Sequence, residues 1–180
     1  KELTWSGQKV AVETGNAGYG TLRSRLLGVH QLENLATAVT AAELLNDLGV
    51  PVPPEAIRKG LAQAEWIGRC QVLGTEPPVL LDGAHNPGAA IVLAATLKKL
   101  LGGQPLALVC GMCADKDARR FFGELQGLVK VCWTVTLATE RSVAGEELAR
   151  QAAGLGCPVQ TSPLPAALAA ATAWARENHG

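Results

Sequence analysis

Residues 80–90 read LLDGAHNPGAA, and they join a predicted strand to a predicted helix. The run PVLL at residues 78–81 is short, apolar and rich in strand-forming residues, which predicts a buried strand of an α/β sheet. An amphipathic helix is predicted over residues 88–101. Ligands of open α/β sheets bind just beyond the carboxyl ends of the strands. We therefore expect a ligand site around Asp82 and His85.

The residues between this strand and this helix suit both a ligand site and a helix start. The carboxylate of Asp82 is able to accept from a ribose hydroxyl, and His85 is able to bind a phosphate oxygen. Asn86 and Pro87 suit the N-cap and the first position of a helix. The two interpretations are compatible, because capping accounts for Asn86 and Pro87 but leaves Asp82 and His85 unexplained.

The composition indicates a protein with a sizeable core and no strong charge. Of the 180 residues, 48% are hydrophobic, and 16 basic residues balance 16 acidic ones. A neutral chain lacks the basic surface that nucleic acid or an anionic membrane requires, and its apolar runs are too short to span a bilayer. The five cysteines lack the spacing of a disulfide framework, which favours reduced thiols and a cytoplasmic location.

The first third of the chain predicts a β-hairpin followed by two helices. The strands are expected over residues 8–14 and 21–27, with the turn supplied by Gly15, Gly18 and Gly20. A helix is expected over residues 34–48, its apolar face formed by Leu35, Val39, Ala42 and Leu45 or Leu48. Pro54 is well placed to open a second helix over residues 55–64, and residues 65–69 read as a linker.

The remainder alternates strands and helices. Strands are predicted over residues 70–74, 78–81, 105–109, 129–135 and 158–160, and helices over 88–101, 117–125, 144–153 and 165–178. This alternation predicts an α/β fold, namely a Rossmann-like, mainly parallel sheet flanked by helices, preceded by the β-hairpin and helix.

Three further motifs leave alternatives open. Arg69, before a strand, either binds a phosphate with its guanidinium or is an exposed hinge residue. Asn34 either caps the following helix or presents its amide to a base edge. The segment CGMC at residues 110–113 is either a redox or metal site or a strand end with a glycine turn. The charged residues at 115–117 either approach a ligand or start the next helix.

Several of these motifs resemble those of one family. LDGAHNP at residues 81–87 resembles the DGAHNP signature of the folylpolyglutamate synthase/dihydrofolate synthase family of the Mur ligase superfamily. WIGR at 66–69 is similar to its WPGR, and GVHQLENLA at 28–36 to its GxHQxxNxxA. GMCADKD at 111–117 resembles its GxxxDKD turn, and TERS at 139–142 stands where the family has a PRA-like stretch. These motifs follow in the family's order.

The resemblance implies an ATP-dependent amide ligase. ATP would phosphorylate a carboxylate of a folate or dihydropteroate, and the amine of L-glutamate would attack the acyl phosphate. The resemblance assigns adenine contact to Asn34, phosphate contact to Arg69, the ribose and nearby nucleotide to Asp82, and the transferring phosphate to His85. Asp82 and His85 are the implied catalytic residues, and no metal ligand is implied in this chain. The expected protein is a cytoplasmic monomer.

The sequence departs from the family in two respects. The family's phosphate loop and Mg²⁺ ligands lie in an ATPase domain ahead of the segment that matches Gly28, and its last strand carries a GSLY motif; this sequence has neither. We therefore expect residues 1–50 to be the end of a central ATPase domain and 51–66 to be a linker and helix. Residues 67–180 are expected to form the Mur ligase C-terminal domain without its last strand, and the isolated chain to be inactive.

Two alternative functions are a cell-wall Mur-type amino-acid ligase and a non-catalytic nucleotide-binding module. The DGAHNP run, and the His30-Gln31 pair where cell-wall enzymes usually have His-Asn, argue against the first. An in-frame phosphate loop upstream in the gene would argue against the second.

Overall fold

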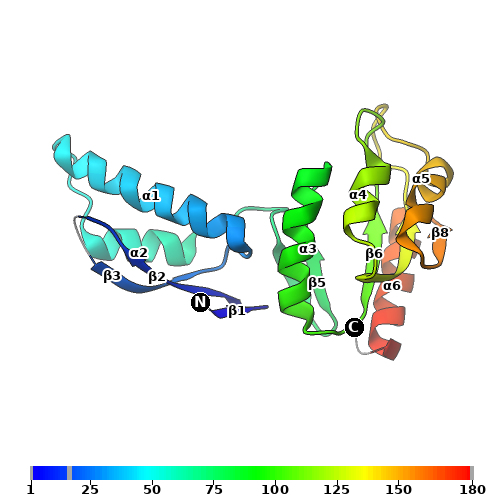
Figure 1. Ribbon diagram of the computed structural model, residues 1–180, viewed down its shortest axis with the longest axis horizontal. Helices are drawn as coiled ribbons and strands as arrows, with labels where there is room; N and C mark the ends of the chain where they lie inside the picture. Colours follow the sequence, from blue (N-terminus) through cyan, green and yellow to red (C-terminus); the bar gives the residue numbers. More distant parts are fainter. Residues whose placement is uncertain (1, 16–17, 179–180) are drawn as a thin grey trace. The chain divides into compact units, whose positions relative to one another are not determined.

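The computed structural model describes residues 2–15 and 18–178 (Figure 1). The chain divides into two compact units, the first comprising Lys1–Leu73 with Leu80–Gly83 and the second comprising Gly74–Val79 with Ala84–Gly180. Each unit has a hydrophobic core of its own. The units are therefore treated separately.

The first unit begins with an antiparallel sheet of three strands, β1 (Glu2–Thr4), β2 (Gly7–Glu13) and β3 (Gly18–Ser24). The hairpin prediction is confirmed, but β3 begins and ends earlier than expected, so Gly18 and Gly20 lie in the strand and not in the turn. The reason is a register shift opposite Val12 and Glu13, which Gly20 accommodates with φ +65°. Part of the predicted turn, residues 16–17, lies outside the described residues.

Two helices complete the core of the first unit, α1 (Val29–Asp47) and α2 (Pro54–Gln63). Pro54 opens α2 as predicted, whereas α1 begins five residues before its expected start because Gly28, not Asn34, is its N-cap. The shared core is formed by Val10, Tyr19, Leu22, Leu35, Val39, Ile57 and Leu61.

The predicted apolar face of α1 is only partly correct. Leu35 and Val39 are buried, but Leu45 and Leu48 are exposed. Glu43 is also buried on this face, where its Oε1 accepts hydrogen bonds from Thr14 (2.6 Å) and Tyr19 (2.9 Å).

Strands β4 (Gln71–Thr75) and β5 (Pro78–Leu81) form a separate two-stranded sheet. The limits of β5 agree with the prediction, but its expected place as a buried strand of the parallel sheet is wrong. Its residues alternate between half-buried and exposed, and Leu81 is 44% exposed. A short apolar run does not distinguish a central strand from the strand of a small sheet.

The second unit is an α/β structure built on a parallel sheet of β6 (Leu106–Cys110), β7 (Val129–Thr134) and β8 (Val159–Thr161). Its helices are α3 (Pro87–Leu101), α4 (Ala118–Glu124), α5 (Gly145–Gln151), a 3₁₀ turn at Ala152–Leu155, and α6 (Leu164–Asn178). These elements lie within a few residues of their predicted limits.

Helices cover both faces of this parallel sheet. Cys132 of β7 packs into a core shared with α3, α4 and α5, whereas Val131 and Trp133 pack with Ala167 and Ala171 of α6. Neighbouring residues of β7 therefore point to opposite helix layers. The predicted α/β fold with a parallel sheet flanked by helices is confirmed. In the described part of the chain, no helix combines the length and apolar character needed to cross a membrane.

Candidate functional site

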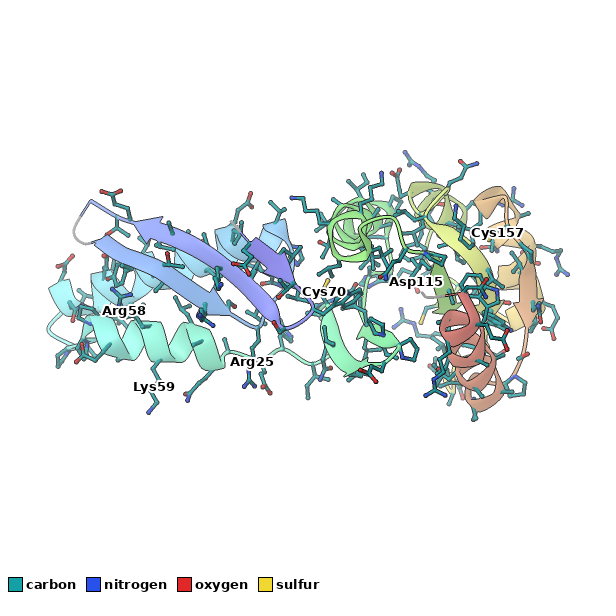
Figure 2. All side chains as sticks on the ribbon, turned by 90° about the horizontal axis from the view of Figure 1, so that it is seen from below. Arg25, Arg58, Lys59, Cys70, Asp115 and Cys157 are labelled. Atoms are coloured by element: carbon teal, nitrogen blue, oxygen red, sulfur yellow. The ribbon has the colours of Figure 1, made fainter. Side chains whose placement is uncertain are left out.

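A tight turn at residues 66–70 presents Arg69. The N–H of Arg69 donates to the carbonyl of Trp66 at 3.2 Å, and Gly68 adopts φ +71°, a conformation that favours glycine. Cys70 follows with φ +43° and is buried, 2% exposed, at the entry to β4 (Figure 2). The guanidinium predicted to contact phosphate therefore belongs to an exposed residue on an ordered turn.

Asp82 and Gly83, directly after β5, are hydrogen-bonded to this turn. The N–H of Cys70 donates to Oδ2 of Asp82 at 2.8 Å, and the N–H of Gly83 donates to the carbonyl of Gly68 at 2.7 Å. The structure thus brings Arg69 and Asp82 together in the first unit. Their side chains supply a cation and a carboxylate at one place, which are the groups that bind phosphate and ribose hydroxyls.

The start of α1 lies within range of these two charges. Burial lowers the pKa of His30, while the negative charge of Asp82 raises it and the positive charge of Arg69 lowers it. Nε2 of His30 lies 3.0 Å from Nε2 of Gln31, whose Oε1 accepts from Nδ2 of Asn34 at 3.0 Å. This polar row runs along the first two turns of the helix.

Asn34 does not cap α1, which corrects one of its two predicted roles. It is an exposed residue one turn inside the helix. Its proposed contact with adenine stays a prediction.

His85 lies in the second unit, where it is exposed and immediately precedes the N-cap of α3. Oδ1 of Asn86 accepts from the N–H of Ala89 at 2.9 Å, and Pro87 is the first residue of the helix. The capping prediction for Asn86 and Pro87 is therefore confirmed. The predicted role of His85 stays a prediction.

The charged residues after β6 are bound within the second unit. Asp117 caps α4 by accepting from the N–H of Arg120 at 3.1 Å, which confirms that this residue starts a helix. Asp115 forms ion pairs with Lys116 (2.7 Å) and Arg141 (3.0 Å). Hydrogen bonds to these two cations lower the pKa of the Asp115 carboxyl to about 2. Arg141 thereby joins the loop after β7 to the loop after β6.

The CGMC segment has the character of a strand end. Cys110 is the last residue of β6, and both it and Cys113 are free thiols. Burial raises the pKa of Cys110 to about 12, whereas a redox-active cysteine needs a lowered pKa. No group of three or more potential metal ligands occurs among residues 2–15 and 18–178. The strand-end interpretation is therefore favoured.

Two features of this region escaped prediction from the sequence. Cys70 holds Asp82 through its backbone N–H, and no sequence signal marks a non-glycine residue with positive φ. A cavity of about 290 Å³ lies beside the turn and is lined in part by Arg25, Glu65, Trp66 and Arg69. Arg25, which Figure 2 labels, forms an exposed ion pair with Glu65 there. The sequence signal that could have pointed to this cavity is the WIGR segment, whose Trp66 is exposed in the structure.

Comparison with known proteins supports the resemblance. The dihydrofolate synthase/folylpolyglutamate synthase of Bacillus subtilis is 34% identical over 127 residues, which are 70% of this chain and 30% of the relative. A crystal structure of Mycobacterium tuberculosis folylpolyglutamate synthase complexed with ADP and AMPPCP superimposes with a TM-score of 0.84 at 28% identity, covering 96% of this chain and 39% of that one. The structure of Escherichia coli FolC in complex with DHPP and ADP superimposes with a TM-score of 0.72 at 32% identity, covering 86% of this chain and 36% of that one.

This chain therefore spans less than half the length of these relatives. The family described as "Mur ligase, glutamate ligase domain" matches residues 68–179. That match covers Arg69, the Asp82-Gly83 pair, His85 and the whole parallel sheet. The chain belongs to the Mur ligase glutamate ligase domain family.

Proposed function

We propose that this chain is the C-terminal part of an ATP-dependent carboxylate–amine ligase. The complete enzyme adds L-glutamate to dihydropteroate or a folate through an acyl phosphate, and releases ADP and phosphate. The proposal extends to this chain what is printed of its relatives, which are folylpolyglutamate and dihydrofolate synthases with structures containing ADP.

The observation that carries the proposal is the joining of Arg69 and Asp82 in the first unit. The family resemblance assigns both residues to the nucleotide, although they are thirteen positions apart in the sequence. Hydrogen bonds from Cys70 and Gly83 hold the two segments together. A cation and a carboxylate fixed in this way suit a nucleotide whose phosphates and ribose need opposite kinds of partner.

In this proposal each predicted residue has one task. Asn34 contacts adenine with its amide, Arg69 binds phosphate oxygens, Asp82 accepts from the ribose, and His85 contacts the transferring phosphate. These residues bind and orient the nucleotide, and such positioning is the principal requirement of phosphoryl transfer. The same side chains that bind the nucleotide would thus align its terminal phosphate with the acceptor carboxylate.

Mg²⁺ is part of the proposed reaction as an ion that would neutralise charge on the phosphates. The described residues of this chain bring together no set of three or more potential ligands for it. We propose that its ligands lie in the ATPase portion that the family places ahead of the segment matching Gly28.

The domain assignment is part of the same proposal. Residues 1–50 would be the end of the central ATPase domain, 51–66 the linker and helix, and 67–180 the Mur ligase C-terminal domain. A monomeric state and a cytoplasmic location complete the proposal; the latter is consistent with five free cysteines.

The experiment is a glutamate-ligation assay on the complete natural protein. Purified protein is incubated with ATP, labelled L-glutamate and either dihydropteroate or tetrahydrofolate, and the labelled product and ADP are quantified. We expect equal amounts of product and ADP with at least one acceptor, and loss of both for His85→Ala at unchanged circular dichroism. A wild-type protein that is folded and binds ATP but ligates glutamate to neither acceptor contradicts the proposal.

A further inference from the structure

The turn at residues 66–70 and the end of β5 are joined by four residues, Gly68, Cys70, Asp82 and Gly83, which we name the latch. Each segment donates one hydrogen bond to the other. The N–H of Cys70 donates to Asp82 at 2.8 Å, and the N–H of Gly83 donates to Gly68 at 2.7 Å. Reciprocal bonds of this kind fix two segments against both sliding and rotation.

Gly83 leaves room for the guanidinium of Arg69. A Cβ at position 83 would lie 2.8 Å from Nη1 of Arg69 and 3.3 Å from the carbonyl oxygen of Gly68. The first distance is shorter than real Cβ contacts allow, so a side chain there has to displace the end of Arg69. The absence of a side chain at Gly83 thus leaves the space that this guanidinium occupies.

Cys70 acts through its backbone. Its thiol is buried, and burial, followed by the charge of Asp82 and a hydrogen bond to it, raises the pKa of the thiol to about 12. The sulfur is therefore a protonated packing group without nucleophilic character. The backbone N–H is directed at Asp82 because Cys70 adopts φ +43°.

We propose that the latch is a positioning device, in which Cys70 fixes the carboxylate of Asp82 and Gly83 fixes the guanidinium of Arg69. The ligand to which these groups are directed is the nucleotide, so this part of the inference rests on the proposed function. A cation and a carboxylate that are held in place before binding lose less conformational entropy when the nucleotide arrives. Cys70 and Gly83 need not touch the nucleotide to affect its binding.

The functional test is a double-mutant cycle in the complete natural protein. Gly83→Ala is expected to raise the KM for ATP about tenfold with a smaller change in kcat, because the displaced guanidinium loses a charge-assisted hydrogen bond to the phosphates. In an Arg69→Ala background the same substitution is expected to have a much smaller effect on this KM, since the displaced guanidinium is already absent and only the 3.3 Å contact with the carbonyl of Gly68 is left. Equal effects in both backgrounds would show a merely structural role and overturn the inference.

Gly88→Ala is the matched control for this cycle. A Cβ at position 88 would meet its nearest atom, Oδ1 of Asn86, at an ordinary 3.5 Å. We expect its KM for ATP to stay within about twofold of wild type, which is below the loss of one weak hydrogen bond. A KM raised as far as by Gly83→Ala would show that any added methyl group near this motif is harmful, and would also overturn the inference.

A second test needs neither ATP nor ligation. Amide hydrogen exchange in the 180-residue chain is followed by NMR for Cys70 and, as an internal control, for Ala89, whose N–H donates to Asn86. Asp82→Ala is expected to accelerate exchange at Cys70 about tenfold or more and leave Ala89 unchanged, because only the acceptor of Cys70 is lost. Unchanged exchange at Cys70 overturns the latch. If the wild-type protein fails to ligate glutamate, the proposed function is wrong. The exchange measurement still tests the latch in that case, because it requires neither ATP nor ligation.

Discussion

His30 is a histidine at the start of α1 whose pKa is shifted by burial and by two charges of the candidate site. It lies in the first turn of α1, and its Nδ1 is the buried side-chain atom that has no hydrogen-bond partner among the described residues. Burial lowers its pKa from the model-compound value of 6.5, with Asp82 opposing this shift and Arg69 adding to it. The folded protein therefore favours the neutral imidazole.

This shift predicts a loss of stability on mild acidification. Unfolded His30 takes up a proton near its ordinary pKa, while the folded form does so only at lower pH. The free energy of unfolding should therefore fall as the pH is lowered from about 7.5 to about 5.5, and the contribution is absent above the unfolded pKa. Urea unfolding at both pH values should show a smaller difference for His30→Asn than for wild type. An unchanged pH difference would contradict the assignment.

For single residues, the sequence predicted those roles that depend on adjacent positions in the chain. Asn86 was identifiable as a cap because Pro87 and an apolar helix follow it directly. The predicted helix start at Asn34 was wrong, because α1 begins at Val29 with Gly28 as its N-cap at φ +108°. The contact between Cys70 and Asp82 joins residues twelve positions apart, so local patterns carry no sign of it.

Among the elements, the helices around the parallel sheet differ in how deeply they are buried. Leu148 of α5 is fully buried in the core that α5 shares with α3 and α4. Leu168 of α6 is 47% exposed. Two leucines on two helices of the same unit therefore provide a matched pair for measuring what core packing contributes.

We expect Leu148→Ala to lower the free energy of unfolding by about 2–5 kcal/mol, because it removes buried methyl groups and leaves a cavity. Leu168→Ala should change it by less than about 1 kcal/mol, since that side chain is half in water already. Urea denaturation followed by circular dichroism measures both. Equal costs for the two variants would contradict the arrangement of α5 and α6 described above.

The elements were predicted well where periodicity and boundary residues agreed, and less well where burial depended on distant partners. Helix α3 has Asn86 and Pro87 at its start and Gly102 at its left-handed C-cap, so its limits could be read from the sequence. The position of β5 was equally clear, but its sheet partner was not. An apolar run specifies a strand and leaves open which sheet it joins.

For the whole molecule, the order of motifs along the chain proved more informative than any single motif. The match over residues 68–179 shows the family, and the chain folds as two compact units, each with its own hydrophobic core. The assignment of residues 1–50 to a central ATPase domain and the roles of Asn34, Arg69, Asp82 and His85 are parts of the proposed function, which measurements on the complete natural protein test.

The most direct test of the account is the KM for ATP of Arg69→Ala in the complete natural protein, measured beside Arg25→Ala. Both arginines line the same cavity, but Arg25 is paired with Glu65, whereas Arg69 rests over Gly83 on the latch. We predict that Arg69→Ala raises this KM by about tenfold or more, and that Arg25→Ala changes it by less than about twofold. An unchanged KM for Arg69→Ala, or an equal rise for both variants, would contradict the central claim that Arg69 binds the nucleotide.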